Sequence, residues 1–361
     1  MKRLSFGLIF WVLVLVGCEA FSSAVPEKEQ FSVVVWNVHN LFDGEDNGNE
    51  YREFRQAAGW TAEKYQARLT AISRLIPQKS ESSLPGLIGL VEVENAGVLN
   101  DLASGPLSRH GYSWFAFTRL PGSAIGLGIL SRFPITDARS HSITIGEASA
   151  PRPILEVRVE PRGEPVVFML CHWKSKLGGA DETEALRRSS ARVVQRRLGE
   201  IKESEPDTPV IVMGDMNVNH DEFYRRSGSI RYALLPDNPD AAVLAVSAFD
   251  ELFGAQDFLV LSGEKPPLPR YFPQETHVLF SPWIDEKSGG SYFFRGSWET
   301  IDHFLLSAAL FSGQGWDYAG AYVLKREPYI TSEGIPNRYI PRSGRGLSDH
   351  LPLLLYLRYF E

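Results

Sequence analysis

Asp349 and His350 stand side by side immediately before the apolar segment 351–357, where both side chains would be partly desolvated. Removing a carboxylate and an imidazole from water costs free energy unless each finds a partner. The same placement, a polar residue at one end of an apolar segment, recurs at Asn37, Glu92, Glu94, His172, Asp215, Asn217 and Asp302. Each alone fits a turn, a half-exposed strand or a hydrogen-bonded core group. Together they predict one shared site, because strand ends in α/β sheets form the crevice where ligands bind.

These residue types favour a metal-assisted reaction at phosphorus. Carboxylate and amide oxygens suit a hard cation, which we expect to be Mg2+, with Mn2+ or Ca2+ as alternatives. A histidine held by a buried aspartate suits proton transfer or the stabilisation of a phosphorane-like transition state. The Gly-Asp-x-Asn turn at residues 214–217 can hold and orient an attacking water. Together these features predict hydrolysis of a phosphoester.

Motifs of rival chemistries are missing from the sequence. No G-x-S-x-G elbow is found, so Ser348 beside Asp349 and His350 is not a hydrolase triad of that kind. P-loop, H-E-x-x-H and dinucleotide-binding motifs are also absent. The two cysteines, Cys18 and Cys171, cannot build a thiolate metal site, and we expect no intramolecular disulfide.

Short apolar segments rich in Val, Ile, Leu and Phe predict the strands that carry these residues. They are 31–37, 86–93, 126–131, 154–160, 165–172, 209–215, 300–307 and 351–357. Helical patterns lie between some of them, at 61–76 behind a Thr cap and at 180–203. Strands mixed with helices predict an α/β or α+β fold in which helices cover the sheets.

One folded domain is expected over residues 31–361. The segments 43–60 and 219–295 are interpreted as long loops on this domain, the second with short elements and many Pro, Gly, Asp and aromatic residues. Long loops in compact domains are often functional. The hydrophobic content of 43% is ample for a core and excludes a disordered chain.

The N-terminus predicts export. Residues 1–17 carry Lys2 and Arg3 and then a short apolar run, which is typical of a secretory signal. The sequence LVGC ending at Cys18 resembles a bacterial lipobox, so we expect Cys18 to be lipidated, with residues 18–30 as a tether. An ordinary signal peptide or an uncleaved anchor, with Cys18 incidental, is the alternative. The expected location is a bacterial membrane, on its periplasmic or cell-surface face.

The formal net charge of −7 disfavours a protein that coats nucleic acid through bulk charge. A phosphate substrate would therefore need locally placed cations. Arg152, Lys174 and Lys176 are candidates for phosphate contacts, and each is equally well explained as a surface residue.

Seven motifs, in this order, resemble the endonuclease/exonuclease/phosphatase family. They are WNVHNLFD, GLVEVEN, GLGILSRFPI, CHWKSK, VMGDMNV, TIDHFLLS and GLSDHLPL, and they run from about residue 31 to residue 357. The resemblance implies a four-layer α/β sandwich, with two packed mixed β-sheets, helices outside and one active site at one edge. The chain departs from the family in one respect, since Val91 stands where many relatives have Gln before the metal-binding Glu.

The resemblance also implies the metal ligands. Glu92 would be the principal ligand, helped by Asn37 and Asp349. Glu94 is the less suitable candidate, because the family's metal-binding Glu follows the apolar run directly.

For the catalytic residues, the resemblance implies that Asp215 positions or activates the attacking water and that Asn217 orients water and phosphate. His350 would contact the scissile phosphate as general base or charge stabiliser, with Asp302 orienting its imidazole. His172 would bind phosphate or help to protonate the leaving oxygen.

The favoured function is a membrane-anchored, metal-dependent phosphodiesterase, a nuclease that works as a monomer on nucleic acid outside the cytoplasm. One alternative keeps the chemistry and takes a phospholipid or inositol-phosphate headgroup. Another is a catalytically silent lipoprotein that binds a surface partner. Five aromatic residues could touch a membrane, stack on nucleobases or belong to the core, namely Trp283, Tyr292, Phe293, Phe294 and Trp298.

Overall fold

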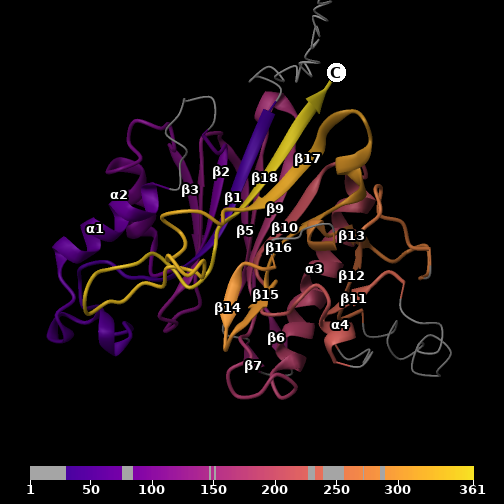
Figure 1. Cartoon of the computed structure of the whole chain (residues 1–361). Helices are drawn as coiled ribbons and strands as arrows, with labels where there is room; N and C mark the ends of the chain where they lie inside the picture. Colours follow the sequence, from indigo (N-terminus) through magenta and orange to yellow (C-terminus); the bar gives the residue numbers. More distant parts are fainter. Residues whose placement is uncertain are drawn as a thin grey trace, which may run out of the picture.

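The computed structural model describes most of the chain from Gln30 to Glu361 (Figure 1). The described residues are 30–74, 84–145, 148–149, 152–226, 232–238, 256–270, 272–284 and 289–361. The predicted signal peptide, Cys18 and the tether up to residue 29 lie outside them. Within the described part of the chain, no helix combines the length and the apolar character that crossing a bilayer requires.

Six strands form the first sheet in the order β17-β18-β1-β2-β4-β3. Their bounds are Gln30–Leu41 (β1), Leu87–Val93 (β2), Trp114–Thr118 (β3), Gly126–Ser131 (β4), Gly315–Val323 (β17) and Leu353–Phe360 (β18). At the centre, β1 is parallel to β2 and antiparallel to β18. The sheet is therefore mixed.

Eight strands form the second sheet in the order β11-β12-β13-β16-β10-β9-β8-β5. Their bounds are Ile135–His141 (β5), Ile154–Val159 (β8), Val166–His172 (β9), Val210–Asp215 (β10), Leu234–Pro236 (β11), Leu259–Ser262 (β12), Val278–Phe280 (β13) and Asp302–Leu306 (β16). Here β10 is parallel to β9 and antiparallel to β16. The region 219–295 thus contributes three short strands to one edge of this sheet, in addition to its loops.

Two hairpins and several helices complete the fold. The hairpins are β6 (Thr144–Ile145) with β7 (Ala148–Ser149) and β14 (Tyr292–Phe294) with β15 (Ser297–Glu299). The α-helices are Ala62–Ser73 (α1), Ala96–Ser104 (α2), Glu184–Ser204 (α3) and Glu222–Arg225 (α4), and the 3-10 helices are Arg52–Phe54 (η2), Gln56–Ala58 (η3), Pro161–Gly163 (η5), Pro282–Ile284 (η6) and Ala308–Phe311 (η7). Thr61 caps α1 by accepting from Lys64 N, as its sequence predicts. The predicted helix 180–203 begins four residues later, at Glu184.

The main core lies between the two sheets, and each sheet has a second apolar face under helices. In β1, Val33 and Val35 belong to the core shared with the second sheet, whereas Trp36 and Val38 pack with residues of α1 and α2. The outer face of the second sheet packs against α3 through residues such as Val194. Alternation of buried side chains on both faces explains why the strands read as continuous apolar runs. The predicted four-layer sandwich is confirmed (Figure 1).

The topology brings the polar strand ends to one edge. The carboxyl ends of the parallel pair β1 and β2 in one sheet face those of β9 and β10 in the other. Because β16 and β18 run antiparallel to their neighbours, it is their first residues that reach the same edge. This edge lies at the opposite end of β18 from the C-terminus (Figure 1).

Candidate active site

Three neighbouring strands of the second sheet place His172, Asp215 and Asp302 side by side. In the strand register Asp215 pairs with His172 of β9 and with Asp302 of β16. All three side chains are buried. Two buried carboxylates beside an imidazole are costly unless the surroundings compensate their charge, so the cluster indicates a functional site.

From the first sheet, Asn37 and Glu92 reach across to this cluster. Asn37 Nδ2 donates to Glu92 Oε1 at 3.2 Å and to Asp215 Oδ2 at 3.0 Å. The side-chain oxygen of Asn37 accepts from His39 N, so the amide has to turn over before Asn37 can offer that oxygen to a metal. As placed, Asn37 joins carboxylates from the two sheets.

A β-bulge aims Glu92 at the site. The register of β2 shifts between Val91 and Val93 against both of its neighbours, and Glu92 has a φ of 68°. The bulge turns Glu92 out of the strand's alternation, and its Oε2 accepts from Asn40 N at 2.9 Å. Asn40 and Asn217 also have positive φ, and backbone strain of this kind tends to gather at functional sites.

His350 is held by Asp302. The imidazole Nδ1 lies 2.8 Å from Asp302 Oδ2, and Ser291 Oγ donates to the same oxygen at 2.5 Å. The Nε2 atom lies 3.9 Å from Asp215 Oδ2. Burial disfavours the imidazolium, but the charge and hydrogen bond of Asp302 and the charge of Asp215 raise the pKa of His350 to about 10.

The backbone around His350 is equally fixed. Trp36 Nε1 donates to the His350 carbonyl at 2.8 Å. Ser348 Oγ donates to the Asn37 carbonyl at 2.6 Å and accepts from His350 N at 3.0 Å. The imidazole therefore has little freedom to move.

Asp215 is oriented from both sides. Its Oδ1 accepts from Asn217 N at 3.0 Å and its Oδ2 from Asn37 Nδ2. Burial raises the pKa of Asp215 to about 7, against the opposing charge of His350 and with the charge of Asp302 acting in the same direction as burial. The Asn217 amide donates to the Trp173 carbonyl at 3.2 Å, which ties the turn to the end of β9.

His172 completes the floor of the site. Its Nε2 atom lies 3.6 Å from Asp215 Oδ2 and 3.8 Å from Glu92 Oε1. Burial, followed by the charge of Arg152, holds the pKa of His172 well below its usual range. It is therefore a neutral imidazole beside two carboxylates.

Asp349 lies at the rim, close to Glu92. Its Oδ1 is 3.7 Å from His39 Nδ1 and its Oδ2 is 3.9 Å from Arg338 Nε. Burial and then the charge of Asp349 raise the pKa of Glu92. A cation beside Glu92 and Asp349 would offset this unfavourable effect on the charge of Glu92.

A second grouping of possible metal ligands lies deeper. One donor atom each from Asp215, Asp302 and His350 lie within 4.8 Å of one another. The His350–Asp302 pair already uses the Nδ1 atom and one carboxylate oxygen. Oxygen ligands on Glu92 and Asp349 therefore fit a hard cation better than this deeper group does.

The three basic side chains that the sequence suggests for phosphate contacts differ in their positions. Arg152 donates to the Trp173 carbonyl at 2.6 Å, and its charge acts on both Glu92 and His172, so it lies beside the site. Lys174 Nζ contacts the carbonyls of its own loop, at Ser175 and Leu177. A phosphate contact of Lys176 stays a prediction.

Lys176 is paired with carboxylates. Its Nζ lies 2.8 Å from Glu222 and 3.5 Å from Glu299. Lys176 therefore links α4 to the β14–β15 hairpin.

Glu94 lies outside this cluster, in line with its lower ranking from sequence. It is 1% exposed, and its carboxylate accepts from Asp43 N at 2.7 Å and from Asn47 Nδ2 at 3.3 Å. Burial raises the pKa of Glu94 to about 7. Its partners belong to the loop 43–60, which it anchors against β2.

Sequence reasoning missed several supporting residues. Ser291, which donates to Asp302, follows two glycines in a segment without any periodic signal. Ser348 stands beside Asp349 in the sequence, but nothing in the sequence indicates its hydrogen bonds to the backbone of Asn37 and His350. His39 has a buried Nδ1 without a hydrogen-bond partner among the described residues, and its position two residues after Asn37 was the only available signal.

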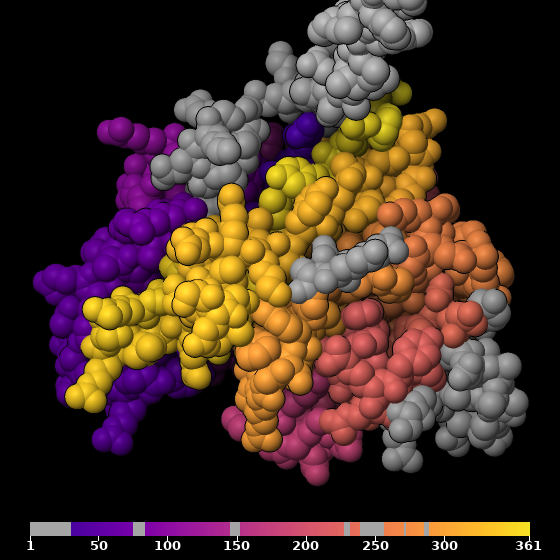
Figure 2. All heavy atoms as spheres, viewed as in Figure 1, coloured from indigo at the N-terminus to yellow at the C-terminus, as the bar shows by residue number. Residues whose placement is uncertain are grey.

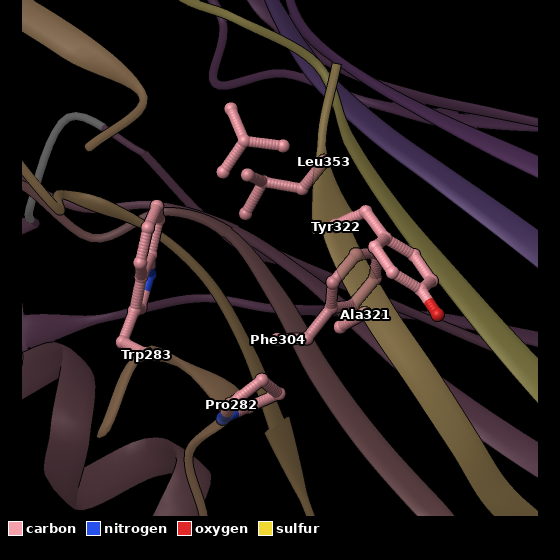
Figure 3. Close-up of a pocket in the computed structure, with 7 residues that line it drawn as sticks. Pro282, Trp283, Phe304, Ala321, Tyr322 and Leu353 are labelled. Atoms are coloured by element: carbon pink, nitrogen blue, oxygen red, sulfur yellow. The ribbon is translucent and has the colours of Figure 1, made fainter. Parts of the chain in front are cut away.

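An apolar notch lies beside the site but does not form it. It is lined by Pro282, Trp283, Phe304, Ala321, Tyr322, Val323 and Leu353 (Figure 3). Trp283 connects the two regions, since its Nε1 donates to the Asp302 carbonyl at 2.7 Å. Tyr322 is the one titratable residue in the lining, so the notch offers nothing for phosphoester chemistry.

Comparisons with known proteins identify the family of the chain. A family model described as Endonuclease/Exonuclease/phosphatase family matches residues 32–228. A comparison with curated proteins finds no match.

Solved structures show the likeness of the fold over most of the chain. An endonuclease/exonuclease/phosphatase from Beutenbergia cavernae has 17% identity and a TM-score of 0.52, over 92% of this chain and 72% of that one. A humanized D. rerio TDP2 has 14% identity and a TM-score of 0.51, over 91% and 99%. A mannosyl-6-phosphatase from Bacteroides thetaiotaomicron has 16% identity and a TM-score of 0.50, over 91% and 100%. At these identities the structures support the fold and leave the substrate open.

Proposed function

The chain belongs to the endonuclease/exonuclease/phosphatase family of divalent-metal-dependent phosphoester hydrolases, and on that premise we propose that it is an exported, Mg2+-dependent nuclease. One observation carries the catalytic part of this proposal. His350 is locked to Asp302 through Nδ1, while its Nε2 faces Asp215 across 3.9 Å. This arrangement leaves one imidazole nitrogen and one carboxylate directed at a common point.

Glu92 and Asp349 would hold the metal ion, with Asn37 joining them when its amide turns over. Their carboxylates lie close enough for one charge to shift the pKa of the other, which fits a shared cation. A bound divalent ion would supply Lewis-acid stabilisation of charge on a phosphoryl oxygen.

Asp215 would accept a proton from the attacking water. Hydrogen bonds from Asn217 N and Asn37 Nδ2 fix both of its oxygens. The Nε2 atoms of His172 and His350 lie 3.6 Å and 3.9 Å from Asp215 Oδ2, and this central position of Asp215 supports the role. Asn217 orients this turn through its bond to Trp173.

His350 would stabilise the charge that develops on the phosphoryl oxygens. Its Nδ1 is committed to Asp302, so only Nε2 can face the substrate. Neutral His172 and the Arg152 guanidinium would bind the phosphate from the side of β9.

The residues around the site favour nucleic acid as the substrate. Exposed aromatic and cationic side chains border the site on the β14–β15 hairpin, including Phe294 and Arg295. Phospholipid headgroups, inositol phosphates and sugar phosphates are the competing substrates. A solved neighbour of similar fold is a mannosyl-6-phosphatase, so a phosphomonoester belongs in the same assay.

The proposed location rests on the N-terminal sequence alone. Lipidation of Cys18 would hold a monomeric enzyme on the outer side of a membrane. Cys18→Ala should move the protein from the membrane fraction to the soluble fraction. Unchanged membrane association of that variant contradicts a lipid anchor at Cys18.

The substrate test compares one preparation on several phosphoesters. The full chain in mild detergent, with Mg2+, is given plasmid DNA, RNA, sphingomyelin vesicles, inositol phosphates and mannose 6-phosphate. Release of product from nucleic acid at a rate at least tenfold above the other substrates supports a nuclease. A preference for any of the others contradicts it while leaving the phosphoester chemistry in place.

A further inference from the structure

We propose that Tyr292 and Phe294 form a stacking platform for an unpaired nucleobase next to the scissile phosphate. The platform, defined by the rings of these two residues, would direct the enzyme toward single-stranded nucleic acid. The inference rests on the proposed nuclease function and adds to it the form of the substrate.

The platform is joined directly to the catalytic imidazole. Tyr292 and His350 form an isolated antiparallel bridge, and Leu351 N donates to the Ser291 carbonyl at 2.7 Å. The neighbouring Ser291 Oγ also donates to Asp302. The hairpin that carries the platform is therefore fixed to His350 and to Asp302, which orients it.

The rings form a continuous stack that leads outward. The Tyr292 ring lies 4.5 Å from the His350 ring at 30°, and the Phe294 ring lies 6.1 Å from Tyr292 at 16°. Residues two apart in a strand share a face, which explains the alignment. Phe294 is 46% exposed at the outer end, so the stack ends on a ring that is open to solvent.

The opposite face of the hairpin has a packing role. Phe293 contacts Trp298 at 5.2 Å, and Lys325 Nζ lies 3.8 Å from the centre of the Trp298 ring. Trp298 packs against the core under α1 and α2. These two aromatics are accounted for by structure, whereas the exposed ring of Phe294 is not.

Cations flank the platform as single-stranded nucleic acid requires. Arg295 lies 5.1 Å from the Phe294 ring, at the tip of the hairpin. Arg338 is 68% exposed beside Asp349, and its charge also acts on Tyr292. Aromatic rings for the bases combined with cations for the backbone are the common design of sites that bind single strands.

A membrane is a poorer fit for this surface. Insertion into a bilayer needs several apolar side chains together, but Ser297 and Glu299 pair with Phe294 and Tyr292 across the hairpin. A duplex is also a poor fit, because its bases are stacked on each other and cannot offer a face. Figure 2 shows the segment around residues 290–300 as a projecting ridge, which gives a strand access from the solvent.

The test compares Phe294→Ala with the full wild-type chain in detergent on three phosphodiesters. These are a short single-stranded oligonucleotide, the same oligonucleotide with abasic residues, and methyl p-nitrophenyl phosphate. Loss of one base-stacking contact, worth about 1–3 kcal/mol, should raise KM for the normal strand by roughly 5- to 150-fold. KM for the abasic strand and KM for the small diester should each change less than twofold.

Two matched variants complete the design. Phe294→Trp should keep the wild-type KM because it keeps a ring, and Phe360→Ala removes a similarly exposed phenylalanine at the far end of β18 as a control. An unchanged KM for the normal strand in Phe294→Ala overturns the platform. An equal rise in KM for the small diester also overturns it. A loss of activity on sphingomyelin vesicles, assayed in parallel, without a loss on the oligonucleotide identifies a membrane contact and also overturns the platform. Failure of the wild type to cut any oligonucleotide contradicts the nuclease proposal itself.

Discussion

His350 Nδ1 and Asp302 Oδ2 lie 2.8 Å apart, although the two residues are 48 positions apart in the sequence. The pair joins the two sheets, because Asp302 begins β16 and His350 precedes β18. Its burial and its second hydrogen bond from Ser291 make it a rigid unit.

Asp302→Asn should lower kcat for phosphodiester hydrolysis by about 10²–10⁴, because the imidazole loses the charge that orients it. KM should change much less, since Asp302 lies behind His350. Ser291→Ala is the comparison variant, and it should lower kcat less than Asp302→Asn does. Steady-state kinetics on a small diester measure both, and equal activity of Asp302→Asn and wild type contradicts the orienting role.

Glu92→Gln should raise the Mg2+ concentration needed for half-maximal activity by at least tenfold, because one charged ligand becomes neutral. Calorimetric titration with Mg2+ gives an independent readout of binding. Glu94→Gln is the matched control, since Glu94 is buried two residues away and contacts the loop 43–60. Equal Mg2+ affinity in Glu92→Gln and Glu94→Gln would sink this assignment.

Much of the site could be predicted because its residues lie at or near the ends of strands, although β1 continues past the predicted end at Asn37 as far as Leu41. The apolar runs ending at Asn37, His172 and Asp215 predict strand ends, and strand ends of a packed sandwich meet at its edges. The direction of Glu92 could not be predicted in this way, because it depends on a bulge. Ser291 could not be found at all, since its contact with Asp302 arises from a hairpin without a periodic pattern.

The strands β11, β12 and β13, at one edge of the second sheet, also could not be predicted from the sequence. Residues 234–236, 259–262 and 278–280 are strands of only three or four residues inside the Pro- and Gly-rich region 219–295. Such short runs carry too few alternations to distinguish a strand from a loop. Their order in the sheet, with β13 on β16, β12 on β13 and β11 on β12, is a tertiary property.

Gly214→Ala should destabilise the fold by at least about 2 kcal/mol. Gly214 has a φ of 128°, and a Cβ at this position would lie 2.0 Å from the Cys171 carbonyl oxygen. The strain would fall directly before Asp215, so activity should drop as well. Denaturant unfolding measures the change, with Gly313→Ala, at a glycine with open space around it, as the comparison. Equal loss of stability in both variants contradicts a steric cause.

Because of Glu156, the free energy of unfolding should depend on pH in the acid range. Burial raises the pKa of Glu156, but hydrogen bonds from His141 and Arg197 and the Arg197 charge lower it to about 2 in the folded protein. Its stabilisation is therefore fully present above about pH 4.5, the unfolded value, and is lost as the pH falls toward 2. The free energy of unfolding should lose on the order of 2–3 kcal/mol across this window through Glu156.

Glu156→Gln tests this directly. The variant should be less stable than wild type at pH 7, and the difference should shrink at pH 3. Glu164→Gln, at an exposed position, controls for general loss of charge. A difference that is independent of pH contradicts the linkage.

The central claim is that residues from two sheets form one hydrolytic site around Asp215 and His350. The most direct measurement is the Mg2+-dependent rate of phosphodiester hydrolysis by Asp215→Ala and by His350→Ala, with circular dichroism to verify folding. Each variant should lose at least about a hundredfold in kcat while remaining folded. Turnover close to that of the wild type in either folded variant contradicts the account.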